Sequence, residues 1–224
     1  MWTEELTLRI INDLVVEKLK FRIVAIDLET RIETRSDFLT DEIILGVSLA
    51  RRLSSGDIER RSLILKEETN ESEYELLREF SDIMKEWNPL VVVGYGCRDY
   101  DLPLLAIKKQ RLKLKEKPVW GISNILNGSV HIELSDLSRY LFTKKYGEPR
   151  KYRSMAYVMK HKHFQDLPFI DTKSEFELSF EGKGKQIYEC WKTKDPKFVN
   201  YLEAEAHDQL LIAERIFNTK FEEV

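Results

Sequence analysis

Residues 21–30, FRIVAIDLET, decide the fold of this chain. The run from Phe21 to Leu28 is apolar and rich in β-branched residues, which predicts a strand buried at the centre of a sheet. Asp27 and Glu29 are two residues apart, so on a strand their side chains project on the same side. Neighbouring carboxylates repel each other unless a cation neutralises them, and hard cations such as Mg²⁺ and Mn²⁺ prefer oxygen ligands. Taken alone, the pair would be read as two solvated acids at a strand end.

Hydrophobic patterns place further strands beside this one. Residues 43–50 and 61–65 predict two strands that join the first in an antiparallel meander, with 31–41 as a connecting hairpin. Residues 90–93 and 130–134 predict two later strands. Helices are predicted at 4–15 (where a strand is an alternative), 71–87, 101–111, 152–160 and 198–218.

The order of these elements predicts an α/β fold in which a mixed central sheet is flanked by helices. The length of 224 residues suits a single domain over 1–224, with 1–20 as an N-terminal extension. Residues 161–196 show no clear period and are interpreted as an insertion or irregular hairpin.

Composition limits where the protein acts and what it binds. The net charge of −3 does not suggest binding to nucleic acid through bulk charge, although a local basic face beside an acidic site is compatible with it. The two cysteines form no CxxC pair, no apolar run approaches the roughly 20 residues that span a bilayer, and the N-terminus is acidic. We therefore expect a cytoplasmic protein.

Two further segments carry candidate acids. Residues 94–105, GYGCRDYDLPLL, directly follow a predicted strand. Asp101 falls where a helix should begin, so its simplest role is a helix N-cap, for which Asp99 competes. Residues 201–217, YLEAEAHDQLLIAERIF, hold Asp208 on the predicted last helix, where the simplest interpretation is a solvated acid.

In order and spacing, these motifs resemble those of the DnaQ-like (DEDD) 3′–5′ exonuclease superfamily. The match is closest to the proofreading exonuclease domains of family B DNA polymerases and to stand-alone archaeal proteins like them, and it covers about residues 20–215. The resemblance implies an RNase H-like fold that hydrolyses phosphodiester bonds of DNA, or of RNA. It assigns Asp27, Glu29, Asp101 and Asp208 to two Mg²⁺ or Mn²⁺ ions, of which one activates the attacking water and the other stabilises the leaving 3′ oxygen.

The last helix departs from the family pattern. Relatives carry a Tyr four residues before the third-motif Asp, or a His five before, and these positions are Ala204 and Glu203. Tyr201 is two turns before Asp208 on the same helix face, so we favour it as the helper. His207 is a second candidate, but as the neighbour of Asp208 it points about 100° away around the helix. Alternatively the register slips, so that Tyr201 keeps its role and Glu205 replaces the aspartate.

Two other positions also differ from the pattern: Gly96 stands where Asn is usual, and Glu133 where Asp is usual. The departures motivate a second hypothesis, a weak or inactive exonuclease-fold module that binds nucleic acid or a replication or repair partner. A third is a structural α/β domain whose acids are caps and surface charges.

Basic and aromatic stretches suit single-stranded or 3′-ended nucleic acid, DNA more than RNA, because phosphates need positive charge and bases need flat rings. For the stretch 108–117, a solvated helix face explains the charges equally well. The candidate nucleic-acid-binding residues are Thr30, Tyr95, Tyr100, Lys108, Lys109, Arg111, Arg150, Lys151 and Arg153.

Overall fold

The computed structural model describes residues 20–31, 42–111, 119–172, 175–176 and 180–219. The predicted helix at 4–15, nearly all of the 31–41 connection and most of the basic stretch 108–117 lie outside these residues.

Five strands form one sheet in the order β3–β2–β1–β4–β5. β1 (Ile23–Arg31) pairs antiparallel with β2 (Ile43–Arg52), which pairs antiparallel with β3 (Ile58–Ile64). On its other side β1 pairs parallel with β4 (Val91–Gly94), and β4 pairs parallel with β5 (Val130–Glu133). The predicted RNase H-like mixed sheet, an antiparallel meander with added parallel strands, is confirmed.

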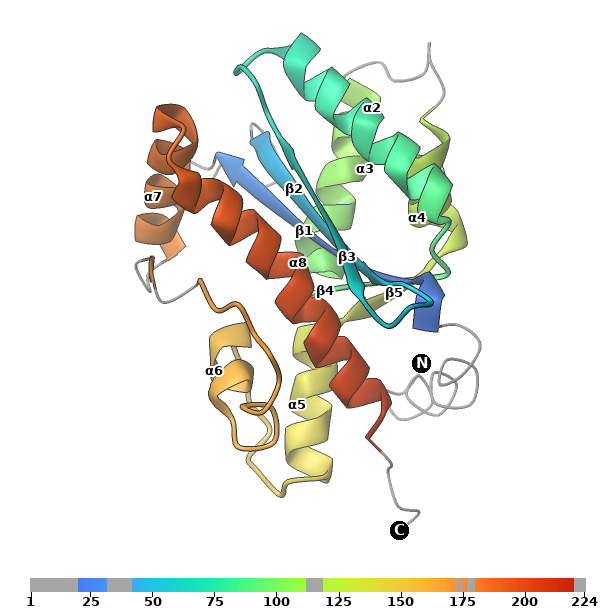
Figure 1. Cartoon of the computed structure of the whole chain (residues 1–224), viewed down its shortest axis with the longest axis vertical. Helices are drawn as coiled ribbons and strands as arrows, with labels where there is room; N and C mark the ends of the chain where they lie inside the picture. Colours follow the sequence, from blue (N-terminus) through green and yellow to red (C-terminus); the bar gives the residue numbers. More distant parts are fainter. Residues whose placement is uncertain (1–19, 32–41, 112–118, 173–174, 177–179, 220–224) are drawn as a thin grey trace.

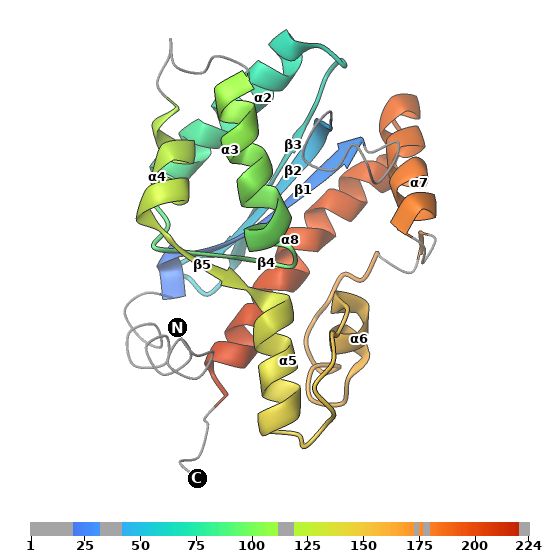
Figure 2. The same ribbon diagram turned by 180° about the vertical axis from the view of Figure 1, so that it is seen from behind.

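The helices cover both faces of this sheet. α8 crosses one face with α5 and α6 beside it, while α2, α3 and α4 cover the other (Figure 1 and, from behind, Figure 2). None of the helices in the described ranges has the length and hydrophobicity to cross a bilayer. The helical elements are η1 (Lys20–Arg22), α2 (Asn70–Trp87), the π-helical turn η3 (Cys97–Asp101), α3 (Leu102–Arg111), α4 (Trp120–Gly128), α5 (Leu134–Lys144), α6 (Met155–Lys160), α7 (Phe180–Thr193) and α8 (Pro196–Phe217).

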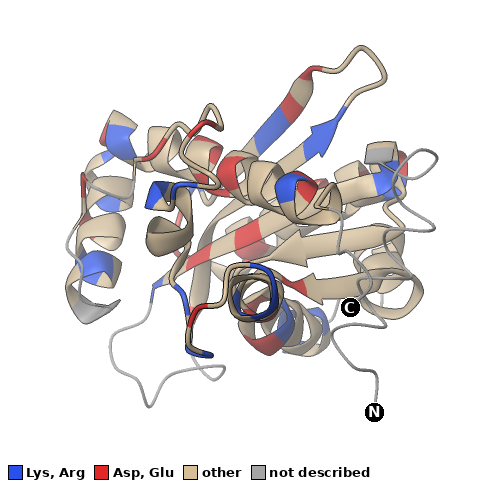
Figure 3. Cartoon of the chain, turned by 90° about the horizontal axis from the view of Figure 1, so that it is seen from below, with Lys and Arg blue, Asp and Glu red and all other residues tan. Residues whose placement is uncertain are grey.

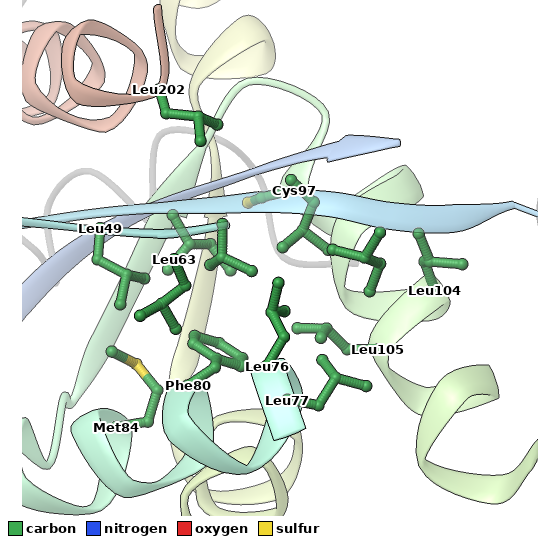
Figure 4. Close-up of a cluster of buried hydrophobic side chains, with 14 of the residues drawn as sticks. Leu49, Leu63, Leu76, Leu77, Phe80, Met84, Cys97, Leu104, Leu105 and Leu202 are labelled. Carbon is green, nitrogen blue, oxygen red and sulfur yellow. The ribbon is translucent and has the colours of Figure 1, made fainter. Parts of the chain in front are cut away.

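The alternation of side chains along β1 explains why it lies at the centre. Ile26 and Leu28 point into a core cluster shared with α2 and α3, whereas Ile23 and Ala25 belong to a second cluster shared with α5 and α8. In Figure 4, Leu202 of α8 lies on the opposite side of the strands from the side chains of α2. Because both faces of the first part of β1 are buried, Ile23–Ile26 are all apolar, in agreement with the apolar run at 21–28.

α8 is fixed against β2 by two small residues. A Cβ atom at Gly46 would lie 2.6 Å from Leu202 Cδ1, so a larger residue here would require the Leu202 side chain to shift. Ser48 Oγ donates to the carbonyl of Leu202 and accepts from the Ala206 N–H at 3.2 Å. These contacts set the rotation of α8 about its own axis, and with it the helix face that meets β1.

Three helices in the second half of the chain were not predicted from the sequence. Residues 180–193 form the helix α7 rather than an irregular hairpin, because Ile187 is buried in the core and Trp191 Nε1 donates to the Leu65 carbonyl at 2.8 Å. α4 and α5 were not predicted. Short helices of this kind gain most of their stability from tertiary packing rather than from local propensity.

Candidate functional site

The two acids of β1 project toward α8. In the β1–β2 register Asp27 lies opposite Ser48 and Glu29 opposite Gly46, the two residues that hold α8. Asp27 is 9% exposed and accepts a hydrogen bond from Gln209 Nε2 of α8 at 2.8 Å. The strand therefore presents the predicted acidic pair to the helix, in a largely buried position.

Asp101 enters the same region from β4 through a tight turn. Gly96 begins the turn with φ of 85°, a left-handed conformation that glycine adopts freely and that Asn tolerates better than most residues. That preference explains why Gly stands where relatives have Asn. Asp101 ends η3 with 3% exposure, and its Oδ2 is buried with no hydrogen-bond partner among the described residues. The competing Asp99 pairs with Arg98 at the surface, at 3.0 Å.

Glu133 organises the turn that carries Asp101. Its Oε1 accepts from the backbone N–H groups of Gly96 at 2.9 Å and Ser135 at 3.1 Å, so one carboxylate both holds the turn and caps α5. Glu133 is 3% exposed. It is thus a buried support, and its longer side chain, compared with the usual Asp, reaches from β5 to the start of η3.

The acid that α8 brings to this cluster is Glu205. Burial first, and then the charges of Glu29, Glu133 and Glu205, raise the pKa of Asp101 well above its usual value. The pKa of Tyr201 is raised in the same way, by burial and then by the charges of Glu205, Glu29 and Asp27. Tyr201 and Glu205 are four residues apart, one helical turn, and both are buried.

Asp208 has a different environment. Its Oδ1 accepts from the Ile170 N–H at 3.0 Å, its Oδ2 accepts from the Asp171 N–H at 3.1 Å, and its Oδ1 also lies 2.8 Å from His207 Nδ1. The carboxylate thus holds the segment before α7 against α8. Of the two acids considered on the last helix, Glu205 is thus the one whose charge acts on Asp101 and Tyr201, whereas Asp208 binds the backbone of Ile170 and Asp171.

The carboxylates match a hard cation in donor chemistry. Oxygen donors come from three separate elements, and the buried Asp101 Oδ2 lacks a partner that a cation would provide. Within the described ranges, however, no three His, Cys, Asp or Glu side chains are already grouped closely enough to hold an ion. The residues therefore fit a divalent cation, provided that the side chains converge when it binds.

Two of the candidate phosphate-binding cations have structural roles instead. Lys108 is 6% exposed and its Nζ lies 2.7 Å from Glu73 Oε1 on α2. Arg153 is 2% exposed, donates to Glu148 Oε2 at 2.9 Å and lies over the rings of Phe142 and Tyr157. These groups face the protein interior, so the expectation that they contact phosphate is not supported by their placement.

The other basic candidates lie nearer to solvent. Lys109 Nζ donates to Ser123 Oγ at 2.7 Å, whereas Arg111, Arg150 and Lys151 are exposed. Figure 3 shows positive and negative residues interspersed on the helices, as the net charge of −3 suggests. The exposed cations are therefore local features rather than part of a uniformly basic face.

The remaining polar candidates flank the acids. Thr30 Oγ1 and Tyr100 Oη share a hydrogen bond of 2.7 Å that links the end of β1 to η3. Tyr95 Oη shares one of 2.8 Å with Ser138 Oγ of α5. Both phenols have a pKa raised mainly by burial. These contacts brace the walls around the cluster.

Two residues near the acids were not identified from the sequence. Gln209 looked like an ordinary polar residue in a charged helix, and only its contact with Asp27 reveals it. Lys183 of α7 has its Nζ 4.7 Å from the ring centroid of Tyr201, which places a cation beside the acidic cluster. A signal for Gln209 existed in hindsight, because it is eight residues after Tyr201 and so lies on the same helix face.

Lys108→Met should destabilise the protein by about 3 kcal/mol, because it leaves the Glu73 carboxylate buried without its ammonium partner. Urea unfolding followed by circular dichroism measures the loss. The double variant Lys108→Met with Glu73→Gln is the control, and it should recover part of the stability. If Lys108→Met left stability unchanged and weakened oligonucleotide binding, Lys108 would instead contribute to nucleic-acid binding.

Comparisons with known proteins bear on the family and the fold of the chain. A family model described as DNA polymerase family B, exonuclease domain, matches residues 11–148, which include the motifs around Asp27 and Asp101 but end before α8. A comparison with curated protein sequences gave no significant match.

One solved structure gives the same picture of the fold. The family B DNA polymerase from the hyperthermophilic archaeon Pyrobaculum calidifontis matches 87% of this chain with a TM-score of 0.57 and 21% identity. This chain spans only 24% of that polymerase. Escherichia coli Exonuclease I in complex with a dT13 oligonucleotide matches 86% of this chain and 40% of its own, with a TM-score of 0.47 and 11% identity. Since the family model matches more than half of the sequence, the chain belongs to the family of exonuclease domains of family B DNA polymerases.

Proposed function

We propose that this chain is a divalent-metal-dependent 3′–5′ exonuclease that hydrolyses phosphodiester bonds of DNA, or of RNA. We assign metal binding to the carboxylates of Asp27, Glu29, Asp101 and Glu205. The observation that carries the assignment is the buried Asp101, whose Oδ2 has no partner among the described residues and whose pKa is raised by burial and by Glu29, Glu133 and Glu205. So much negative charge in a buried place is costly unless a cation is bound there.

Each of the chain's own groups has a defined task in this proposal. A pair of bound Mg²⁺ or Mn²⁺ ions would supply a water activated for attack and stabilisation of the leaving 3′ oxygen. Asp27 and Glu29 would present oxygen ligands from the rigid centre of the sheet, and Asp101 and Glu205 from η3 and α8. Rigid elements suit this task because metal ligands must be held in place.

Tyr201 is assigned to the attacking water as a hydrogen-bond donor. Burial and the nearby carboxylates raise the pKa of its phenol well above the usual value, so the hydroxyl keeps its proton at neutral pH. A protonated phenol can orient a water but cannot accept its proton. In this proposal Tyr201 orients the water but does not take its proton; a bound cation would lower the pKa of that water, so that the proton could leave to bulk solvent.

The rival function is a weak or inactive module that binds nucleic acid or a replication or repair partner. Gly96 favours it, because the amide side chain that relatives carry at this position is missing. A Cβ atom built on Gly96 would meet nothing within 4 Å, so no steric contact at that atom requires glycine here.

One assay separates the two functions. Single-stranded DNA labelled at its 5′ end is incubated with the protein and Mg²⁺ or Mn²⁺, beside an Asp27→Ala variant and an RNA of the same sequence. An exonuclease of 3′–5′ polarity gives a ladder of shortened labelled products that the variant does not give. Retained oligonucleotide binding without a ladder favours the module, and an identical ladder from Asp27→Ala would reject the assigned site.

A further inference from the structure

We propose that Gln209 is a positioning residue, which holds the Asp27 carboxylate in the orientation that metal binding requires. The inference rests on the proposed function, since it concerns a ligand of the same site. Gln209 directly follows Asp208 in the segment 201–217, but the sequence assigned it no role.

Gln209 is an unusual residue for its place in the core. It is fully buried on α8, and the next three residues of the helix, Leu210, Leu211 and Ile212, are apolar. An amide buried among apolar groups costs free energy unless both its ends are hydrogen-bonded. Packing alone would be served as well by Leu or Met, so the amide is explained by its partners.

The two ends of the amide have different partners, and they fix its orientation. Gln209 Oε1 accepts from the backbone N–H of Tyr95 at 3.2 Å, and Nε2 donates to Asp27 Oδ1 at 2.8 Å. Since a backbone N–H can only donate, it must face the oxygen, which leaves the NH₂ group for the carboxylate. The reverse orientation would set two donors against each other and an oxygen against a carboxylate.

The close approach of the surrounding backbone keeps the amide in place. A Cβ atom on Gly94 would lie 3.1 Å from Gln209 Oε1 and 2.8 Å from the carbonyl oxygen of Ile26. The Gln209 side chain thus lies in a narrow space between the middle of β1 and the end of β4, where the Ile26 carbonyl leaves no room for a Cβ atom on Gly94. Gln209 links the β1 acid to the start of the turn that carries Asp101.

The chemistry of this contact suits a supporting residue. An amide orients the carboxylate without cancelling its charge, whereas a Lys or Arg in the same place would compete with a cation. It binds Oδ1 of Asp27 and so restrains the rotation of the carboxyl group. Partners of metal ligands typically change metal affinity or activity by about 10–100-fold when they are replaced.

The test is the binding of Mn²⁺ to the full chain without nucleic acid, measured from the electron paramagnetic resonance signal of the free ion. Gln209→Met keeps the volume and removes both hydrogen bonds. We expect its Kd for Mn²⁺ to rise about 10–100-fold, with a matching rise in the Mn²⁺ concentration needed for half-maximal cleavage. Gln209→Asn is the second variant, because its shorter amide cannot reach both partners, and it should shift the same constants in the same direction.

Two controls separate positioning from stability. Glu214 lies on α8, like Gln209, and forms an ion pair with Arg52 of β2; Glu214→Gln should weaken this pair and lower the Tm without changing the Kd for Mn²⁺. In an Asp27→Ala background, Gln209→Met should have no further effect on the Kd.

Three results would overturn the inference. One is a lower Tm with an unchanged Kd in both Gln209 variants, and another is an undiminished effect in the Asp27→Ala background. A wild-type chain that neither binds Mn²⁺ nor cleaves DNA would reject the proposed function, and this inference with it.

Discussion

Glu205→Gln should lower the rate of exonuclease cleavage by about 10³-fold, which corresponds to about 4 kcal/mol of transition-state stabilisation. Gln keeps the size of the side chain but removes the charge that the proposed metal site needs from α8. Single-turnover cleavage of 5′-labelled DNA in saturating Mg²⁺ measures the effect. Glu205→Asp, which restores the residue type usual in relatives, should retain measurable activity.

Asp208→Asn is the matched comparison on the same helix. Its carboxylate holds the backbone of Ile170 and Asp171, so the substitution should cost about 1–2 kcal/mol of stability and less than tenfold in rate. If Asp208→Asn instead lowered cleavage far more than Glu205→Gln, Asp208 rather than Glu205 would be the functional acid of α8.

The choice between these two acids shows where sequence reasoning about the site reached its limit. Tyr201 lies four residues before Glu205 and seven before Asp208, and both spacings place two side chains on one helix face. Periodicity therefore cannot decide between them. The decision comes from Gly46 and Ser48, two small residues on β2, which set the rotation of α8 through contacts more than 150 residues apart in the chain.

The strands were predictable for a simple physical reason. A central strand must be apolar on both faces, and the run 21–28 has almost no other explanation. α5 was missed because β5 passes into it directly, with no Gly or Pro between them, and because Glu133 rather than a more common capping residue caps the helix. α7 was missed because Gly182 and Gly184 weaken its helical pattern, and tertiary contacts overcome their cost.

The basic stretches show a different limit. Lys108 and Lys109 are adjacent and chemically identical, yet one is buried against Glu73 and the other lies nearer the surface. Successive residues of a helix point about 100° apart, so a run of lysines necessarily divides between faces. Charge in a sequence predicts a phosphate contact only when the buried face of its helix is known.

Asp101→Asn should abolish cleavage and yet stabilise the metal-free protein at neutral pH, with a Tm higher by at least about 2–4 °C, which is about 1 kcal/mol for a chain of this size. Burial and the charges of Glu29, Glu133 and Glu205 raise the pKa of Asp101 in the folded state. The folded protein therefore holds this proton more tightly than the unfolded chain does. Asn keeps the shape, removes the buried charge and can donate to the neighbouring carboxylates.

The tighter binding of this proton in the folded state also fixes the direction in which stability depends on pH. The contribution of Asp101 to stability is fully present below its unfolded pKa of about 3.9 and is lost as the pH rises through its raised folded pKa. Thermal unfolding in EDTA across this range should show a Tm advantage of Asp101→Asn that is small in acid and grows with pH.

Added Mn²⁺ should make the Tm of the wild type higher than that of Asp101→Asn. A cation that binds only the folded state raises the Tm of the wild type by mass action, whereas the variant lacks one of the ligands. A wild type that is the more stable protein at neutral pH in EDTA would mean that Asp101 is already neutralised by groups of the protein itself. The buried acids would then be structural, and the argument for a metal site at the end of β1 would lose its main support.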